Sequence, residues 1–163
     1  MNHRLPFITI VIICLSLLGF GYYLQFFQGL EPCPLCIVQR LFFMGIITLA
    51  LLAALHGPAA LGAKIYGGML ATLCLGGAAV AARQVWLQHL PPERVPECGP
   101  DLAFMMELYE PMQIVRWLYE GTGDCAEVNW TFLGFSIAEW SLGWFVVLAL
   151  TGLIIGLRTR TRD

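Results

Sequence analysis

Four long apolar runs constrain the fold of this chain more than any other feature. They cover residues 5–27, 37–55, 65–82 and 140–157, and the only charged side chain within them is Arg40. A hydrocarbon layer about 30 Å thick is crossed by roughly 20 helical residues, with about 17 as a lower limit. The runs lack the alternation of barrel strands, so helices satisfy their backbone groups best in lipid. They therefore predict an all-α membrane protein built as a four-helix transmembrane bundle.

The composition excludes most soluble classes of protein. The chain has 163 residues, of which 58% are hydrophobic and 12% charged, whereas a typical soluble domain is about 25% charged. A chain this short cannot bury so much apolar surface in one soluble core. A net charge of −2 without a basic patch also argues against nucleic-acid binding. We expect residues 1–163 to form a single integral membrane domain whose first run is an uncleaved anchor, since it is too long for a signal peptide.

The charged residues are distributed unevenly between the two sides of the predicted bundle. Ten of the eleven acidic residues fall in the connecting loops 28–36 and 83–139. The ends of the chain and the short link 56–64 carry basic residues and a single carboxylate, Asp163. The positive-inside rule therefore places both termini in the cytoplasm and the two loops on the outer side.

The long outer loop has two contrasting parts. Its first part, residues 91–100, contains four prolines and predicts extended chain and turns. Residues 112–119 are apolar and aromatic but too short to span a membrane. We expect them to form a short helix lying in the membrane interface, with a hairpin packed against the bundle as the alternative.

The six cysteines divide into two groups by their depth in the predicted bundle. Cys14 and Cys74 lie in the middle of apolar runs, where cysteine behaves as a small hydrophobe, so we expect them to serve packing. The other four lie on the predicted outer face: Cys33, Cys36, Cys98 and Cys125. An even set of cysteines in an oxidising compartment is expected to form two disulfides. Bonds that only staple the loops are one interpretation, which suits the widely spaced pair better than the close one.

The close pair, in the sequence Cys-Pro-Leu-Cys, has the spacing of a reversible thiol pair. A bond across a two-residue loop stabilises a fold weakly, whereas this spacing favours a lowered thiol pKa and exchange. The motif opens a predicted helix with Pro34 near its first turn, and a helix N-terminus stabilises a thiolate. Arg40 follows Cys36 by four residues and shares its helix face. We interpret Arg40 as a functional cation beside the sulfur, with an ordinary interfacial anchor as the alternative.

These residues favour redox exchange over metal binding. A Cys-x-x-Cys pair supplies half of a zinc site, but the other two outer cysteines are widely separated, and His3, His56 and His89 do not complete a set. We therefore expect no metal site. The sequence has no haem-attachment motif and no Gly-rich flavin fingerprint, which leaves a lipid-soluble quinone as the electron acceptor. The residues thus predict a membrane dithiol–disulfide oxidoreductase with two redox pairs.

Several stretches resemble the bacterial DsbB family of disulfide bond formation proteins. They are residues 31–36, Gln39 with Arg40, residues 98–100, and residues 123–127 followed by Trp130. The similarity covers nearly the whole chain, including the order of spans, the loop lengths and the four outer cysteines. It implies a quinone-dependent protein-disulfide oxidoreductase of the bacterial inner membrane, with periplasmic redox loops and a thioredoxin-fold partner of the DsbA type.

The resemblance also implies a role for each site residue. Cys98 would be attacked by the active-site thiolate of the DsbA-type partner. Cys125, freed by that attack, would pass electrons by exchange to Cys33. Cys36 would be the sulfur next to the quinone, either ubiquinone or menaquinone. Arg40 would hold the quinone and stabilise the negative charge that develops on it.

Other interpretations stay open at this point. A paralogue with the same chemistry could serve one dedicated thioredoxin-like partner. Proteins similar to vitamin K epoxide reductase also combine four helices, a Cys-x-x-Cys pair and a quinone, but their quinone-proximal pair belongs to the last span, and the last run here has no cysteine. A membrane scaffold with static loop disulfides is the non-enzymatic alternative. A contact between His89 and the quinone is also left open.

Overall fold

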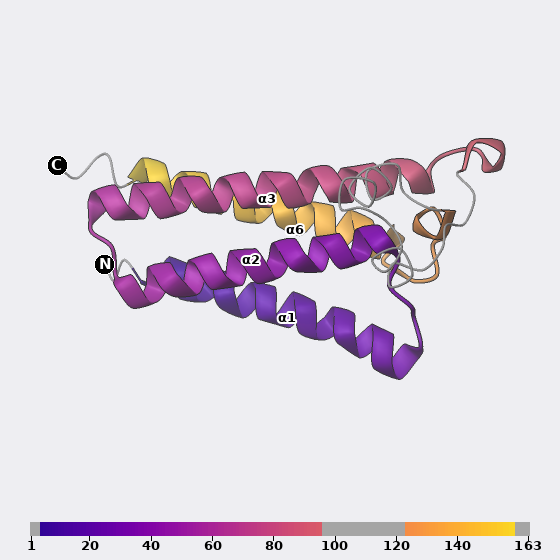
Figure 1. Ribbon diagram of the computed structural model, residues 1–163, viewed down its shortest axis with the longest axis horizontal. Coiled ribbons are helices and arrows are strands. Elements are labelled where there is room, and N and C mark those ends of the chain that lie inside the picture. Colours follow the sequence, from indigo (N-terminus) through magenta and orange to yellow (C-terminus); the bar gives the residue numbers. More distant parts are fainter. Residues whose placement is uncertain (1–3, 96–122, 159–163) are drawn as a thin grey trace, which may run out of the picture.

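Four long helices form the molecule, in a computed structural model that describes residues 4–95 and 123–158. The helices are α1 (Leu5–Gln28), α2 (Pro34–His56), α3 (Ala60–Gln88) and α6 (Ile137–Arg158). All four are long and apolar enough to cross a membrane, and they run lengthwise through the molecule (Figure 1). The predicted all-α four-helix bundle is confirmed.

Local sequence signals set the ends of the helices. α1 and α2 each end at a glycine in the left-handed conformation, Gly29 with φ 67° and Gly57 with φ 60°, which glycine adopts without steric cost. α2 begins at Pro34, because proline at the first helical position loses no hydrogen bond. α3 extends beyond the apolar residues 65–82 at both ends, because the helix continues through Lys64 and Arg83.

α3 and α6 pack backbone against backbone. A Cβ atom added at Gly67 would lie 2.7 Å from the carbonyl oxygen of Gly152 and 3.0 Å from the nitrogen of Gly156. Small residues of this kind let membrane helices approach closely. Further along the bundle, Phe43 of α2 stacks on Phe145 of α6, with ring centroids 4.3 Å apart. These contacts make a dense core that holds α2, α3 and α6 together.

A short β-hairpin precedes α6, at the end of the bundle where α2 begins (Figure 1). Its strands β1 (Thr131–Phe132) and β2 (Phe135–Ser136) are antiparallel. Leu133 and Gly134 connect them with φ values of 54° and 84°, as in the two-residue turns that suit the twist of a hairpin. The sequence did not predict this hairpin.

The hairpin is fixed to two helices at Ser136. The Glu139 carboxylate accepts a 2.7 Å hydrogen bond from the Ser136 backbone N–H, and the Ser136 hydroxyl accepts one of 3.3 Å from the Glu139 N–H. This reciprocal pair caps the start of α6. The same hydroxyl donates to the side-chain oxygen of Gln88 at 2.8 Å, which ties the hairpin to α3.

Two single-turn 3₁₀ helices complete the described elements, η1 (Pro92–Arg94) and η2 (Gly123–Cys125). The interfacial helix expected at residues 112–119 lies outside the described residues. Cys14 and Cys74 are fully buried in the apolar core, in agreement with the packing role expected for them.

Candidate functional site

The Cys-x-x-Cys motif forms the start of α2. Cys33 is the N-cap residue, with extended backbone, and its sulfur accepts a 3.4 Å hydrogen bond from the backbone N–H of Cys36. Its thiol also donates to the Cys36 sulfur at 2.8 Å. Pro34 occupies the first turn, so the local sequence alone places both sulfurs at the helix N-terminus, as the spacing predicted.

Cys125 joins this motif from the far side of the long loop. The η2 turn buries it completely beside Leu35 and Leu87, with Cys33 packed against the same cluster. Its hydrogen bond with Cys33 is the largest cause that raises the pKa of the Cys33 thiol, followed by the bond to Cys36 and by burial. The fold thus brings three of the four outer cysteines together, and Cys98 lies outside the described residues.

A pair of buried glutamines completes the sulfur cluster, and the sequence analysis assigned a role to neither of them. Gln84 of α3 donates to the Cys33 sulfur at 3.3 Å and to the Cys36 sulfur at 3.2 Å. Its side-chain oxygen accepts a 2.6 Å hydrogen bond from Gln39. The signal available in sequence was weak: an uncharged polar residue at the outer end of an apolar run, one position after Arg83.

Arg40 is anchored to α1. Its guanidinium donates to the side-chain oxygen of Gln25 and, at 3.3 Å, to the carbonyl of Gly21. It also lies over the ring of Tyr22, 4.7 Å from the centroid, in a cation–π contact. These three contacts with α1 fix the position of the Arg40 guanidinium beside that helix.

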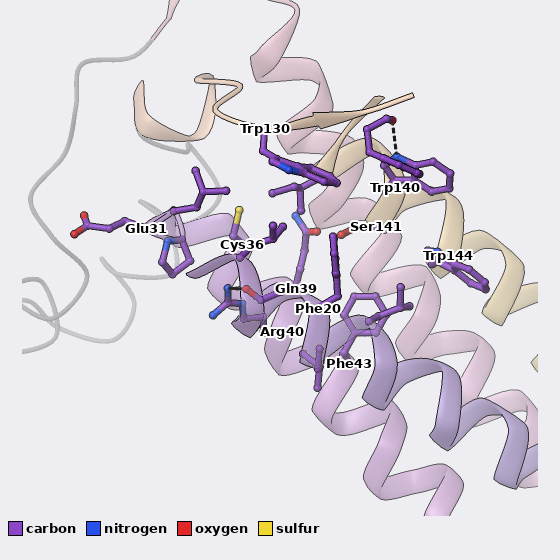
Figure 2. Close-up of a pocket in the computed structure, with 18 residues that line it drawn as sticks. Phe20, Glu31, Cys36, Gln39, Arg40, Phe43, Trp130, Trp140, Ser141 and Trp144 are labelled. Carbon is purple, nitrogen blue, oxygen red and sulfur yellow. Dashed lines mark hydrogen bonds between the residues drawn. The ribbon is translucent and has the colours of Figure 1, made fainter. Parts of the chain in front are cut away.

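Cys36 and Arg40 line the same cavity. It has a volume of about 420 Å³ and is bordered by α1, α2, the hairpin and α6. Figure 2 shows Cys36, Gln39 and Arg40 along one side of α2, and the polar lining also includes Glu31 and Ser141. Its aromatic lining includes Phe20, whose ring meets that of Trp130 edge to face at 5.6 Å. The arrangement offers a mainly apolar slot whose wall contains one sulfur, the cation of Arg40 and the carboxylate of Glu31.

His89 does not belong to this cavity. It caps the C-terminal end of α3, is exposed, and donates through Nδ1 to the Val85 carbonyl at 2.8 Å. It is not among the residues that line the slot. Within residues 4–95 and 123–158, no group of three or more His, Cys, Asp or Glu side chains is placed to hold a metal ion.

Fold and site together define a class: a multi-pass helical membrane protein with a thiol cluster at one end of its bundle. Comparison with known sequences specifies it further. The family model described as "Disulfide bond formation protein DsbB" matches residues 3–155, and the chain belongs to this family. Membership identifies a membrane protein of disulfide bond formation with disulfide oxidoreductase activity.

Individual relatives agree over nearly their whole length. The protein named Disulfide bond formation protein B from Azoarcus sp. (strain BH72) is 47% identical over 161 residues, which are 98% of this chain and 96% of that protein. Its namesake from Marinobacter nauticus is 44% identical over 158 residues, 97% of this chain and 94% of the relative. The one from Xanthomonas axonopodis pv. citri is 45% identical over 161 residues, 98% and 93% of the two chains.

Proposed function

We propose that this protein reoxidises a periplasmic thioredoxin-fold protein of the DsbA type and passes the electrons to a membrane quinone, ubiquinone or menaquinone. The observation that carries the proposal is the position of Cys36. Its sulfur accepts a hydrogen bond from Cys33 within the thiol cluster, and it lines the aromatic cavity together with Arg40. One sulfur therefore borders both the thiols and a slot suited to a flat apolar acceptor.

The cavity has the properties that a quinone head group needs. Its 420 Å³ falls within the range of about 300–1,000 Å³ that small-molecule sites occupy, and its walls are mainly apolar and aromatic. When bound, a quinone supplies the capacity to accept two electrons and two protons. Arg40, held by Gln25 and Gly21, is a fixed cation at the cavity wall that stabilises negative charge developing there.

Two thiol exchanges would bring the electrons to Cys36. In the first, the partner's thiolate attacks Cys98 of a Cys98–Cys125 disulfide, which forms a mixed disulfide and releases Cys125 as a thiolate. In the second, Cys125 attacks Cys33, breaks the Cys33–Cys36 bond and leaves the electron pair on the Cys36 sulfur. Each attack forms one S–S bond and breaks another. The hydrogen bond between Cys33 and Cys125 supports the second exchange.

Reduction potentials indicate that the two disulfides must pass their electrons to a stronger oxidant. DsbA is a strong oxidant at about −120 mV, whereas structural disulfides lie below about −300 mV. Because about 30 mV corresponds to 1.4 kcal/mol in a two-electron couple, an ordinary structural disulfide cannot reoxidise such a partner. The relay therefore needs a strong oxidant after Cys36, and a quinone is the class of oxidant that reaches the cavity from the bilayer.

We also propose an inner-membrane location with both termini in the cytoplasm. The end of the bundle that holds the α2–α3 link carries Arg4 and Lys64, while the opposite end carries the carboxylates Glu31, Glu93, Asp124, Glu127 and Glu139. By the positive-inside rule, this distribution of charge supports a periplasmic position for the thiol cluster.

Quinone reduction by the purified protein in detergent tests this proposal. The protein receives a reduced DsbA-type partner and a soluble quinone, and wild type is compared with Cys36→Ser and Cys98→Ser. We expect turnover in the wild type and its loss in both variants. A mixed disulfide to the partner should be trapped at Cys98 in the Cys36→Ser protein, which retains Cys98, and not in Cys98→Ser. A wild-type protein that reduces no quinone with any thioredoxin-fold donor contradicts the proposal and favours a scaffold with static disulfides.

A further inference from the structure

We propose that Gln84 is a further catalytic residue of the thiol exchange and that Gln39 is the positioning residue that orients it. Gln84 donates a hydrogen bond to Cys36, the sulfur that leaves as a thiolate when the Cys33–Cys36 bond opens. This inference rests on the proposed function in one respect, which is that Cys33 and Cys36 form the disulfide that is attacked.

The geometry places one amide nitrogen between two sulfurs. Nε2 of Gln84 lies 3.3 Å from the Cys33 sulfur and 3.2 Å from the Cys36 sulfur. Gln84 belongs to α3 and lies 48 positions after Cys36 in the sequence, whereas both cysteines lie at the start of α2. The packing of α3 against α2 therefore delivers a donor to the reacting atoms.

Gln39 determines which end of the amide meets the sulfurs. Its Nε2 donates to Oε1 of Gln84 at 2.6 Å, so that this oxygen is engaged and the N–H groups of Gln84 face the thiols. Gln84 can still accept from a protonated Cys36, whose sulfur lies 3.6 Å from Oε1. The same amide thus contacts Cys36 whether the sulfur carries a proton or a negative charge.

Burial strengthens the effect of these hydrogen bonds on the charge of the sulfur. Gln39 and Gln84 are each only 4% exposed, so water does not replace either partner. A buried amide without a partner costs free energy, and a hydrogen bond to a charged acceptor is stronger than one to a neutral acceptor. The pair is therefore pre-organised to stabilise charge that appears on sulfur during the reaction, as the donors of an oxyanion hole do for oxygen.

The step that Gln84 assists is balanced within the protein and its attacking thiol. A thiolate attacks Cys33, a new S–S bond forms there, and the Cys33–Cys36 bond breaks. The electron pair of the broken bond stays on Cys36, which becomes a thiolate. Nε2 of Gln84 donates to that sulfur as its negative charge develops.

The test measures opening of the Cys33–Cys36 disulfide by dithiothreitol, which needs neither quinone nor protein partner. The full chain carries Cys98→Ser and Cys125→Ser so that only this pair reacts, and trapped thiols are counted over time by mass. Gln84→Met keeps the side-chain length but removes both donors. Gln88→Met, one turn further along α3, is the matched control, because Gln88 bonds Ser136 and no sulfur.

We expect Gln84→Met to slow opening by about 10- to 100-fold, Gln39→Met to slow it less, and Gln88→Met to leave it unchanged. The equilibrium between disulfide and dithiol, measured against dithiothreitol, should shift toward the disulfide in the same order. If Gln84→Met fails to fold, Gln39→Met is decisive through both measurements. Opening rates within twofold of the parent for both variants overturn the inference. A parent protein in which no Cys33–Cys36 disulfide forms contradicts the proposed function itself.

Discussion

The guanidinium of Arg40 on α2 donates a hydrogen bond to the side-chain oxygen of Gln25 on α1. Arg40 lines the aromatic cavity together with Gly21 and Leu24 of α1, so Gln25 holds a cavity residue from the neighbouring helix. The first helix therefore serves the site although it contributes no outer cysteine. Its amide and the Gly21 carbonyl fix the direction in which the cation points.

Removing the positive charge of Arg40 should impair reduction of the quinone. We expect Arg40→Ala to lower kcat/KM for quinone by about 10- to 100-fold, since a hydrogen bond to a charged group is lost. Gln25→Leu should lower it by about 3- to 10-fold, because Arg40 keeps its charge but loses a neutral partner. Steady-state rates at varied quinone concentration check both values. Lys64→Ala at the opposite end is the control, and an Arg40→Ala enzyme with unchanged kcat/KM speaks against this role.

The contact between Cys33 and Cys125 predicts a specific cross-link. In a chain carrying Cys36→Ser and Cys98→Ser, mild oxidation should join Cys33 to Cys125 in high yield, because exchange requires only that the two sulfurs meet. Peptide mapping of the non-reduced protein detects the bond. Absence of this cross-link would show that the two sulfurs do not come together in the folded protein.

Cys33 should be a poor nucleophile when reduced. Its hydrogen bond with Cys125, then that with Cys36, raises the pKa of the thiol, so the thiolate is depleted at neutral pH and becomes populated only as the pH rises. We expect Cys33 to react with iodoacetamide more slowly between pH 6 and 9 than a free cysteine, whose pKa is about 8.5. Cys125→Ala removes the largest cause and should accelerate the reaction. Equal rates in the two proteins contradict this assignment.

The glycine contact between α3 and α6 predicts a difference between neighbouring substitutions. Gly67→Ala should lower the free energy of unfolding by about 1–3 kcal/mol, because overpacking at a tight contact forces the backbone to shift, and its new Cβ would lie 2.7 Å from the Gly152 oxygen. Gly68→Ala meets nothing within 4 Å and should not destabilise. Unfolding in detergent, followed by helical circular dichroism, compares the two. Equal stability of both variants would argue against the tight α3–α6 contact.

The sequence predicted the parts of this structure that depend on local chemistry. Apolar length predicted the four helices, and Pro34 predicted that the cysteine pair would open one of them. The ends of the helices were harder to predict than their existence. The third apolar run ends at residue 82, whereas α3 continues to Gln88. The hairpin at residues 131–136 was not predictable from hydropathy, because its two strands are only two residues long.

The shared contacts of the site could not be read from sequence. Gln84 is 45 positions from Gln39, and only the packing of α3 against α2 brings the two amides together. The meeting of Cys125 with Cys33 likewise depends on tertiary structure, and the roles of the four outer cysteines stay a prediction. Arg40 was recognisable as a charge in an apolar run, but its partners on α1 were not.

The central claim is that electrons from the partner's thiols leave through Cys36 to a quinone, and their stoichiometry tests it most directly. Reduced DsbA-type partner, purified protein and a measured amount of quinone are mixed without oxygen, and quinol and partner disulfide are counted together. We predict one quinol for each disulfide formed in the partner. With Cys36→Ser we predict no quinol and no more than one partner disulfide per protein molecule, the one supplied by the Cys98–Cys125 bond. Partner disulfides that accumulate without quinol would contradict it.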